Sequence, residues 1–187
     1  WGTEDIASLT EQQVPALLNI QLAALKTEQV MAFETSDLVQ LTSDQIPALT
    51  EQQIQAMTTQ QISRLLTSQV QALTTAQIEA LATAQVQALT TAQVAALTIN
   101  QVEVLETADL VKLTTAQIQA LTTAQVQALT TAQMPTLLTS QVAALLTSQV
   151  ESLETADLVK LTTAQVQALT TAQVQALTTD QVPTLLT

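Results

Sequence analysis

The chain of 187 residues contains no cysteine, histidine or tyrosine, and it has only one tryptophan and one phenylalanine. It therefore lacks the thiol and imidazole groups that most often serve as nucleophile, base or soft metal ligand, and serine or threonine without a base partner is a weak nucleophile. The only basic residues are Lys26, Arg64, Lys112 and Lys160, and the net charge is −12. This balance excludes a basic nucleic-acid-binding surface and argues against binding to an anionic membrane.

Glycine and long apolar runs are also scarce. The chain has one glycine, and no apolar run approaches the roughly 18 residues of a membrane helix, so we expect no membrane insertion. There is no signal peptide and no initiator methionine, and the sequence stops within a repeat at Leu185-Leu186-Thr187. We therefore expect an excised segment. Because 47% of the residues are apolar, the composition is not that of a disordered chain.

The abundant feature is a word of eight residues that runs through the chain without insertion or deletion. With Leu73 counted as position 1, position 6 is always valine, isoleucine, leucine or methionine. Position 5 is glutamine in nineteen octads and aspartate in four. The 23 complete octads and one fragment are joined by no linker. We therefore expect one continuous repeat solenoid over residues 1–187.

The octad is predicted to be helical. A strand solenoid would need turn residues in every coil, and the near absence of glycine argues against them. Alanine, leucine and glutamine favour helix. On a helical wheel, position 6 and the following position 1 lie about 60° apart, so they predict a narrow apolar stripe that faces a core. The stripe includes Leu73, Leu81, Leu89, Val86 and Val94.

A single long helix is excluded by the repeat length. Eight residues overshoot two helical turns by about 80°, so the apolar stripe would wind around the helix. The helix must break in every octad, and Thr74-Thr75-Ala76-Gln77 indicates a capping box at the break. The register is open by one residue, and in Leu138-Thr139-Ser140-Gln141 we expect the threonine to be the cap. All four prolines lie at position 7, which we expect to fall in the first turn of a short helix.

Position 5 is the candidate structural site. Glutamine and aspartate both offer a carbonyl-type oxygen, and a polar group at the edge of an apolar stripe should be hydrogen-bonded. We hypothesise that this oxygen accepts hydrogen bonds from free backbone N–H groups at each corner. The alternative is a solvent-exposed glutamine kept by recent duplication. The candidates are Gln77, Gln85, Gln93, Gln117 and Gln125.

A longer period underlies the octad. Similar words begin at Glu34, Glu106 and Glu154, which are separated by 72 and 48 residues. Pro15 and Pro135 are separated by 120 residues. All three spacings are whole multiples of three octads. We therefore expect an all-α solenoid with three short helices per coil, and two helices per coil is the main alternative.

The acidic words are the remaining chemical candidates. Paired carboxylates can act as acid and base, and the pairs Glu106 with Asp109 and Glu154 with Asp157 could form weak calcium sites, since hard cations prefer oxygen ligands. A solvated surface is the simpler interpretation. We expect no enzymatic activity, no cofactor and no strong metal site.

The word Leu89-Thr90-Thr91-Ala92-Gln93-Val94-Ala95-Ala96-Leu97 resembles the octapeptide arrays of large repetitive bacterial surface and secreted proteins, including adhesin-like ones. The resemblance implies an extracellular or cell-surface setting and carries over no site residues. We expect a non-enzymatic structural rod, a spacer or a self-assembling scaffold. Its expected partners are further copies, bound end to end or laterally, or other surface proteins.

The threonine pairs support an alternative function. Regularly spaced threonines on a rigid surface look like the arrays of ice-binding proteins, although helix capping already explains the positions of these threonines. The alternative prediction is a protein- or surface-binding module, including one that binds ice or another crystal surface.

Overall fold

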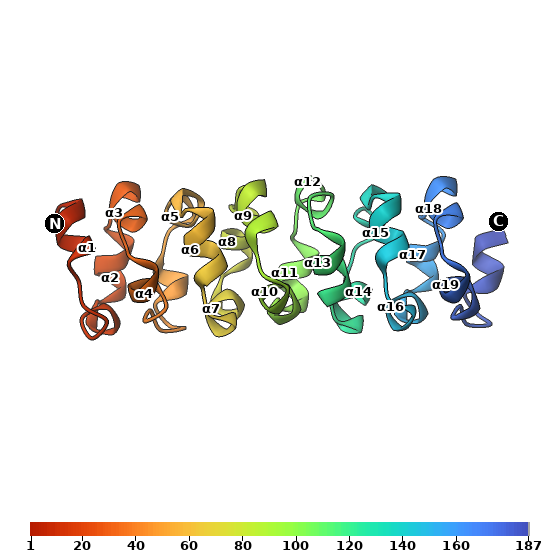
Figure 1. The fold of residues 1–187 in the computed structure, drawn as a ribbon, viewed down its shortest axis with the longest axis horizontal. Coiled ribbons are helices and arrows are strands. Elements are labelled where there is room, and N and C mark those ends of the chain that lie inside the picture. The colour runs from red at the N-terminus through yellow and green to blue at the C-terminus, as the bar shows by residue number, and fades with distance from the viewer. Residues whose placement is uncertain (187) are drawn as a thin grey trace. The chain divides into compact units, whose positions relative to one another are not determined.

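The computed structural model describes residues 1–186, and every regular element in that range is a short helix (Figure 1). Each octad contributes one segment of three to six residues. Residues 1–186 contain no β-strand, so the prediction of an all-α repeat solenoid is confirmed. Because isolated helices of this length are unstable in water, each segment depends on packing against its neighbours.

The segments form two compact units, Trp1–Leu97 and Thr98–Thr187, and each unit is described by itself. The elements of unit 1 are α1 (Thr3–Ala7), η1 (Val14–Ala16), α2 (Asn19–Ala23), α3 (Thr27–Met31), α4 (Thr35–Leu38), η2 (Ile46–Ala48), α5 (Glu51–Ala56), α6 (Thr59–Arg64), α7 (Thr67–Ala72), α8 (Thr75–Glu79), α9 (Thr83–Ala88) and α10 (Thr91–Ala96). The elements of unit 2 are α11 (Ile99–Glu103), α12 (Thr107–Leu110), α13 (Thr115–Ala120), α14 (Thr123–Gln127), η3 (Met134–Thr136), α15 (Thr139–Ala144), α16 (Thr147–Ser152), α17 (Thr155–Leu158), α18 (Thr163–Gln167), α19 (Thr171–Gln175) and η4 (Val182–Leu186). A single uninterrupted solenoid over residues 1–187 remains a prediction from the sequence.

Within each unit the segments stack in three rows, because each segment contacts the one that lies three octads further along the chain. In unit 1 the first row is α1, α3, α5 and α8, the second includes α4, α6 and α9, and the third is α2, η2, α7 and α10. In unit 2 the first row is α11, α14, α16 and α19, the second includes α17 and η4, and the third is α13, α15 and α18. The same three-octad spacing assigns η1, α12 and η3 to the second row. Three segments therefore complete one coil in each unit.

The core of each coil is built from positions 1 and 6. The position-6 side chains from Ile6 to Leu158 are at most 1% exposed. The position-1 side chains from Phe33 to Leu153 are 3–5% exposed. Both positions lie on the stripe expected from the helical wheel, so local periodicity alone predicted the residues that fill the interior.

The helix start differs from one sequence expectation. Each α-helix has its N-cap at position 2, including the octads in which that residue is leucine. Leu138 is the N-cap of α15, and Thr139 is its first helical residue. The prediction that the threonine caps these helices is therefore wrong. Leu138 makes no side-chain cap bond, and its backbone N–H donates to Gln141 Oε1 at 2.8 Å, so the glutamine completes this corner without a threonine.

The prolines lie in the first turn of short helices, as expected, but these are 3-10 helices rather than α-helices. Pro15, Pro47 and Pro135 are the second residues of η1, η2 and η3, and Pro183 is the second residue of η4. Pro47 would be the fifth residue of a helix that starts at position 3. It has no N–H to donate, and its ring clashes with the carbonyl four residues earlier. In this octad the chain therefore forms a turn followed by η2.

Candidate functional site

The corner before most helices is closed by a glutamine at position 5. At the start of α8 the Thr74 N–H donates to Gln77 Oε1 at 2.8 Å. In return the Gln77 N–H donates to Thr74 Oγ1 at 3.1 Å. These reciprocal bonds are the capping box that the sequence indicates, and they satisfy backbone groups that the helix itself leaves without a partner.

The other half of the same amide reaches the preceding coil. Gln77 Nε2 donates to the carbonyl oxygens of Ile46 at 3.0 Å and Leu49 at 2.6 Å. These carbonyls lie 31 and 28 residues earlier, at the start of η2 and the corner that follows it. The Gln77 side chain therefore bonds the corner before α8 and also joins this corner to that of the preceding coil.

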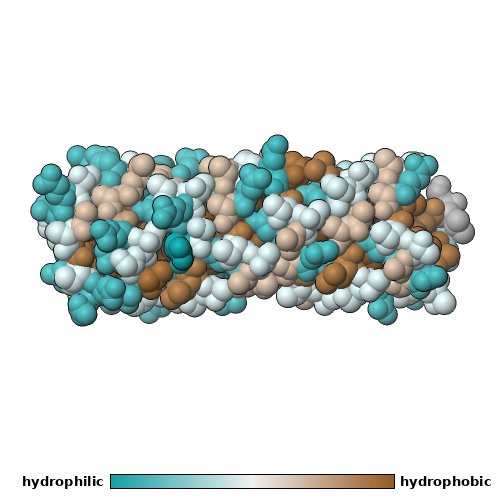
Figure 2. All heavy atoms as spheres, viewed as in Figure 1, coloured by the Kyte–Doolittle hydropathy of each residue, from teal (hydrophilic) through white to brown (hydrophobic). Residues whose placement is uncertain are grey.

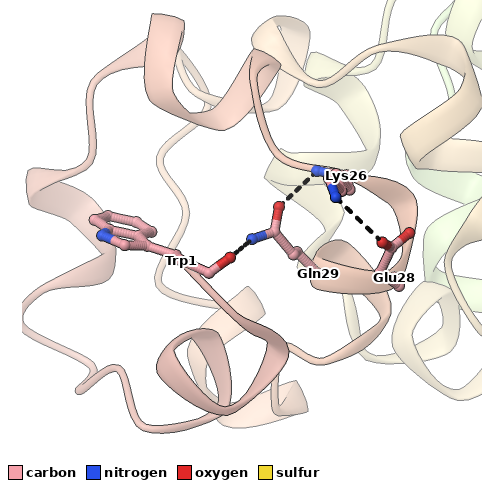
Figure 3. A network of polar contacts seen from close by, with 4 residues as sticks. All are labelled: Trp1, Lys26, Glu28 and Gln29. Carbon is pink, nitrogen blue, oxygen red and sulfur yellow. Dashed lines mark hydrogen bonds and ion pairs between the residues drawn. The ribbon is translucent and has the colours of Figure 1, made fainter.

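The arrangement can be followed at Gln29 in Figure 3. Gln29 Oε1 accepts from the Lys26 N–H at 2.7 Å, and Gln29 Nε2 donates to the Trp1 carbonyl. Lys26 Nζ lies 4.0 Å from Glu28 Oε1, but both side chains are largely exposed. A surface ion pair of this kind contributes little to stability, so the glutamine makes the structurally important contact at this corner.

We call this set of position-5 contacts the glutamine ladder. Its amides donate 28 and 31 residues back at Gln45, Gln53, Gln61, Gln69, Gln77, Gln85 and Gln93 in unit 1. They do the same at Gln133, Gln141, Gln149, Gln165, Gln173 and Gln181 in unit 2. All thirteen residues are 1–4% exposed. A buried amide with every polar atom paired stabilises the stack and avoids the cost of desolvated, unpaired groups.

The other site residues predicted from the sequence lie at corners, in the core or on the surface. Gln117 and Gln125 accept from the N–H groups of Thr114 and Thr122 at 2.8 and 2.7 Å. The predicted stripe residues are buried in the core, namely Leu73, Leu81, Leu89, Val86 and Val94. Thr75, by contrast, is exposed and is the first residue of α8, while Thr74 carries the cap.

The hypothesis of a shared acceptor oxygen does not include the donor half of the glutamine. Aspartate and glutamine both offer an acceptor oxygen, but only glutamine also carries N–H donors. The preference for glutamine, which occupies nineteen of the 23 position-5 sites, is the signal in the sequence for this donor. An acceptor alone is supplied equally well by shorter side chains at helix starts, so this preference indicates a second contact.

The aspartates at position 5 do not act alike. Asp5 Oδ2 accepts from the Gly2 N–H at 2.7 Å, as the hypothesis expects. Within residues 1–186, the helices that contain Asp37, Asp109 and Asp157 show no such side-chain cap bond. Each of these three is only 3–4% exposed. The hypothesis of a shared acceptor therefore fails at these three corners, and a carboxylate has no N–H with which to hold the preceding coil.

Two of these buried carboxyl groups have altered acidity. Burial first, and then the negative charges of Glu34 and Glu11, raise the pKa of Asp37 above its ordinary value of 3.8. Burial first, and then the charge of Glu154, raise the pKa of Asp157 above the same value. The cause is common to both, because a carboxylate in a poorly solvated site beside like charge favours its neutral form.

The acidic words do not gather into a larger cluster. Glu106 and Glu154 are exposed N-cap residues, whereas Asp109 and Asp157 are buried in the first turn of α12 and α17. In the described part of the chain, no three histidine, cysteine, aspartate or glutamate residues lie close enough to hold a metal ion. Two carboxylates per word fall short of the six to eight oxygen ligands that calcium takes.

The comparisons with known proteins address the repeat itself. A family model described as the ALTTAQ repeat matches the chain at residues 19–51, 30–67, 65–99, 102–139 and 150–187. These matches cover more than half of the chain. No curated protein matches it. Within residues 1–186, no helix has the length and apolar character needed to span a membrane.

Proposed function

The chain belongs to the ALTTAQ repeat family, and from this premise we propose that it is a non-enzymatic structural repeat, a spacer or scaffold in a bacterial surface or secreted protein. The location rests on the resemblance of its octad to arrays in such proteins. The structural role rests on the glutamine ladder, which joins each coil to the coil before it within a unit.

The ladder supports a structural role because its contacts are regular and local. Each rung joins residues that lie 28 and 31 positions apart in the chain. Its amide bonds to backbone groups of the same protein and not to an outside partner. Solenoids with such neighbour-only contacts are extended by adding repeats. The outward positions mostly repeat threonine, alanine and glutamine, which offer a partner few distinctive features.

Deletion of whole coils tests this proposal. Removing the three octads from Thr58 to Leu81 joins Met57 to Ala82 and keeps the order of the three rows. We expect the shortened chain to fold, with its longest dimension in small-angle X-ray scattering reduced by about 8–10 Å, the spacing of packed helices. Inserting a second copy of the same three octads should lengthen the particle by the same amount. A particle whose dimension does not follow the number of coils would contradict a spacer function.

A surface-binding function is the second candidate, and the exposed threonines favour it. In the second row of unit 2, Thr107, Thr131, Thr155 and Thr179 follow one another at intervals of three octads, and all four are exposed. A protein that binds a crystalline surface such as ice would need side chains that are equally spaced on successive coils, as these threonines are. Thermal hysteresis of a dilute solution of the chain measures ice binding directly, and its absence would reject that form of the second candidate.

A further inference from the structure

Charged residues are distributed unequally among the three rows. In unit 2 the first and second rows carry every charged residue, seven acidic and two basic. The third row consists of the octads 113–120, 137–144 and 161–168, with α13, α15 and α18, and contains no charged residue. In unit 1 the corresponding octads contain a single charged residue, Asp44. We call the third row of unit 2 the uncharged face.

The exposed side chains of this face are small or weakly polar. Thr115, Ala116 and Gln119 are exposed on the first of its octads, and threonine, alanine and glutamine recur at the same positions of the last one. At the two corners that flank α15, Leu138 and Leu146 are 49% and 45% exposed. Figure 2 shows the hydropathy of one side of the molecule, where hydrophilic, intermediate and hydrophobic residues are all exposed.

The distribution of charge determines which side of unit 2 a second copy of the chain can approach with least repulsion. The chain has a net charge of −12, so two copies repel when their acidic rows approach. The uncharged face avoids this repulsion. The nearest charges along the chain are Lys112 and Lys160, which immediately precede its first and last octads. They are exposed, and their positive charges locally offset the negative charge of the molecule. The uncharged face is therefore the side of unit 2 on which two copies can pack with least electrostatic cost.

We propose that the uncharged face of unit 2 is a lateral docking surface for a second copy of this chain. The contact packs threonine, alanine and glutamine side chains of one copy against those of the other, with Leu138 and Leu146 supplying exposed apolar surface at the edges. The inference deepens the proposed scaffold function and rests on it. It can fail independently, because a monomeric solenoid would still lengthen coil by coil and so remain a spacer.

A pair of matched variants tests the proposal. Gln119→Glu with Gln167→Glu places two carboxylates on the uncharged face. Gln127→Glu with Gln175→Glu places two carboxylates at the same octad position on the first row of the same unit. All four glutamines are exposed. The octad tolerates glutamate there, since Glu103 and Glu151 occupy that position naturally. The two variants therefore change the total charge equally and differ in the face that carries it.

The readout is sedimentation velocity of the full chain over a concentration series. We expect the unmodified chain to self-associate as its concentration rises. The dissociation constant should increase at least ~10-fold in Gln119→Glu with Gln167→Glu, because like charges then meet. The first-row variant should change it less than about twofold, since exposed distant charges are largely screened. Circular dichroism of both variants verifies that the helices are retained.

Salt dependence and ice binding separate the alternatives. Added salt screens the net negative charge, so association through the uncharged face should strengthen with salt, whereas pairing of acidic with basic edges should weaken. The proposal is overturned if the chain stays monomeric at millimolar concentration, if both variants weaken association equally, or if added salt dissociates the copies. Thermal hysteresis of a monomeric chain, lost only in the variant of the uncharged face, would overturn it in favour of a solid surface as the occupant of this face.

Discussion

The amide of Gln93 shows why this residue type recurs at position 5. Its oxygen accepts from the Thr90 N–H at 2.8 Å, and its nitrogen donates to the carbonyls of Ile62 and Leu65 at 2.8 and 2.7 Å. Asparagine carries the same amide on a side chain that is one methylene shorter, and glutamate has the length but no donor. The side chain is 2% exposed, so water is poorly placed to replace a missing partner.

Two substitutions of this residue distinguish the acceptor from the donor. Gln93→Ala should lower the free energy of unfolding by about 1–3 kcal/mol, because it leaves buried backbone groups unpaired. Gln93→Glu should be worse at neutral pH, because a carboxylate would face two carbonyl oxygens. Its neutral form can donate one hydrogen bond, so stability should partly return in acid. Chemical denaturation at pH 7 and pH 4 measures both effects, and equal stability of Gln93→Ala and the unmodified chain would remove the ladder's assigned role.

A substitution at Asp157 gives the opposite test, because it adds a glutamine contact where the chain has none. The residues 31 and 28 positions earlier are Val126 and Leu129, so Asp157→Gln should place an N–H donor at their carbonyls and stabilise the chain at neutral pH. The pKa of Asp157 is raised in the folded state. Its favourable contribution is therefore fully present below the ordinary pKa of 3.8 and is lost as the pH rises through the folded pKa.

It follows that the advantage of Asp157→Gln should be larger at pH 7 than at pH 3.5. Thermal unfolding of both proteins at the two pH values measures the difference. Asp5→Gln is a suitable control, because Asp5 is exposed and already holds its N-cap N–H. An advantage of Asp157→Gln that is the same at both pH values would show that protonation of Asp157 does not affect folding.

At the scale of the element, each helix is too short to be stable alone, so its ends matter more than its interior. The predicted capping box is present wherever position 2 is threonine at the start of an α-helix, as at Thr74 and Thr90. Where the residue is Leu66 or Ala82, the glutamine still accepts from the corner N–H at 2.8 and 2.7 Å. Wherever position 5 is glutamine, its side chain therefore makes this bond with or without a threonine at position 2, and the threonine adds a second bond.

The threonine pair of one octad separates these contributions. Thr74→Ala removes the oxygen that accepts from the Gln77 N–H and should destabilise the chain by about 1 kcal/mol. Thr75→Ala, one residue later, replaces an exposed first-turn residue and should change stability by less than about 0.5 kcal/mol. Urea denaturation of the two variants provides the comparison. The interpretation of Thr74 as the cap fails if the two variants lose the same stability.

At the scale of the whole molecule, the order within each unit comes from a period of three octads. Three octads complete a coil, and each rung of the ladder joins residues 28 or 31 positions apart. Pro15 falls in the second row of unit 1, and Pro135 and Pro183 fall in the second row of unit 2, whereas Pro47 falls in the third row of unit 1. The same period keeps charge off the third row of unit 2. A change of sequence therefore has an effect that depends on its row as well as on its position in the octad.

The sequence by itself determined the helical octad, the break in every word, the Thr74 capping box and the buried stripe that contains Leu73 and Val86. These features depend on interactions within about eight residues, so they are legible in local periodicity and residue type. The in-phase recurrence of the words at Glu34, Glu106 and Glu154 also predicted three helices per coil, because irregular words had to recur on the same side.

Only the tertiary structure decided what the glutamines reach and how irregular octads adapt. The bond from Gln77 to Leu49 spans 28 residues, and nothing in a single octad specifies which corner will lie beneath another. The leucine N-caps, the 3-10 segment at Pro47 and the corner at Asp37, which is closed without a side-chain cap bond, have the same origin. In each case a local preference competes with the stacking of coils, and the stacked neighbours fix where the corner must lie.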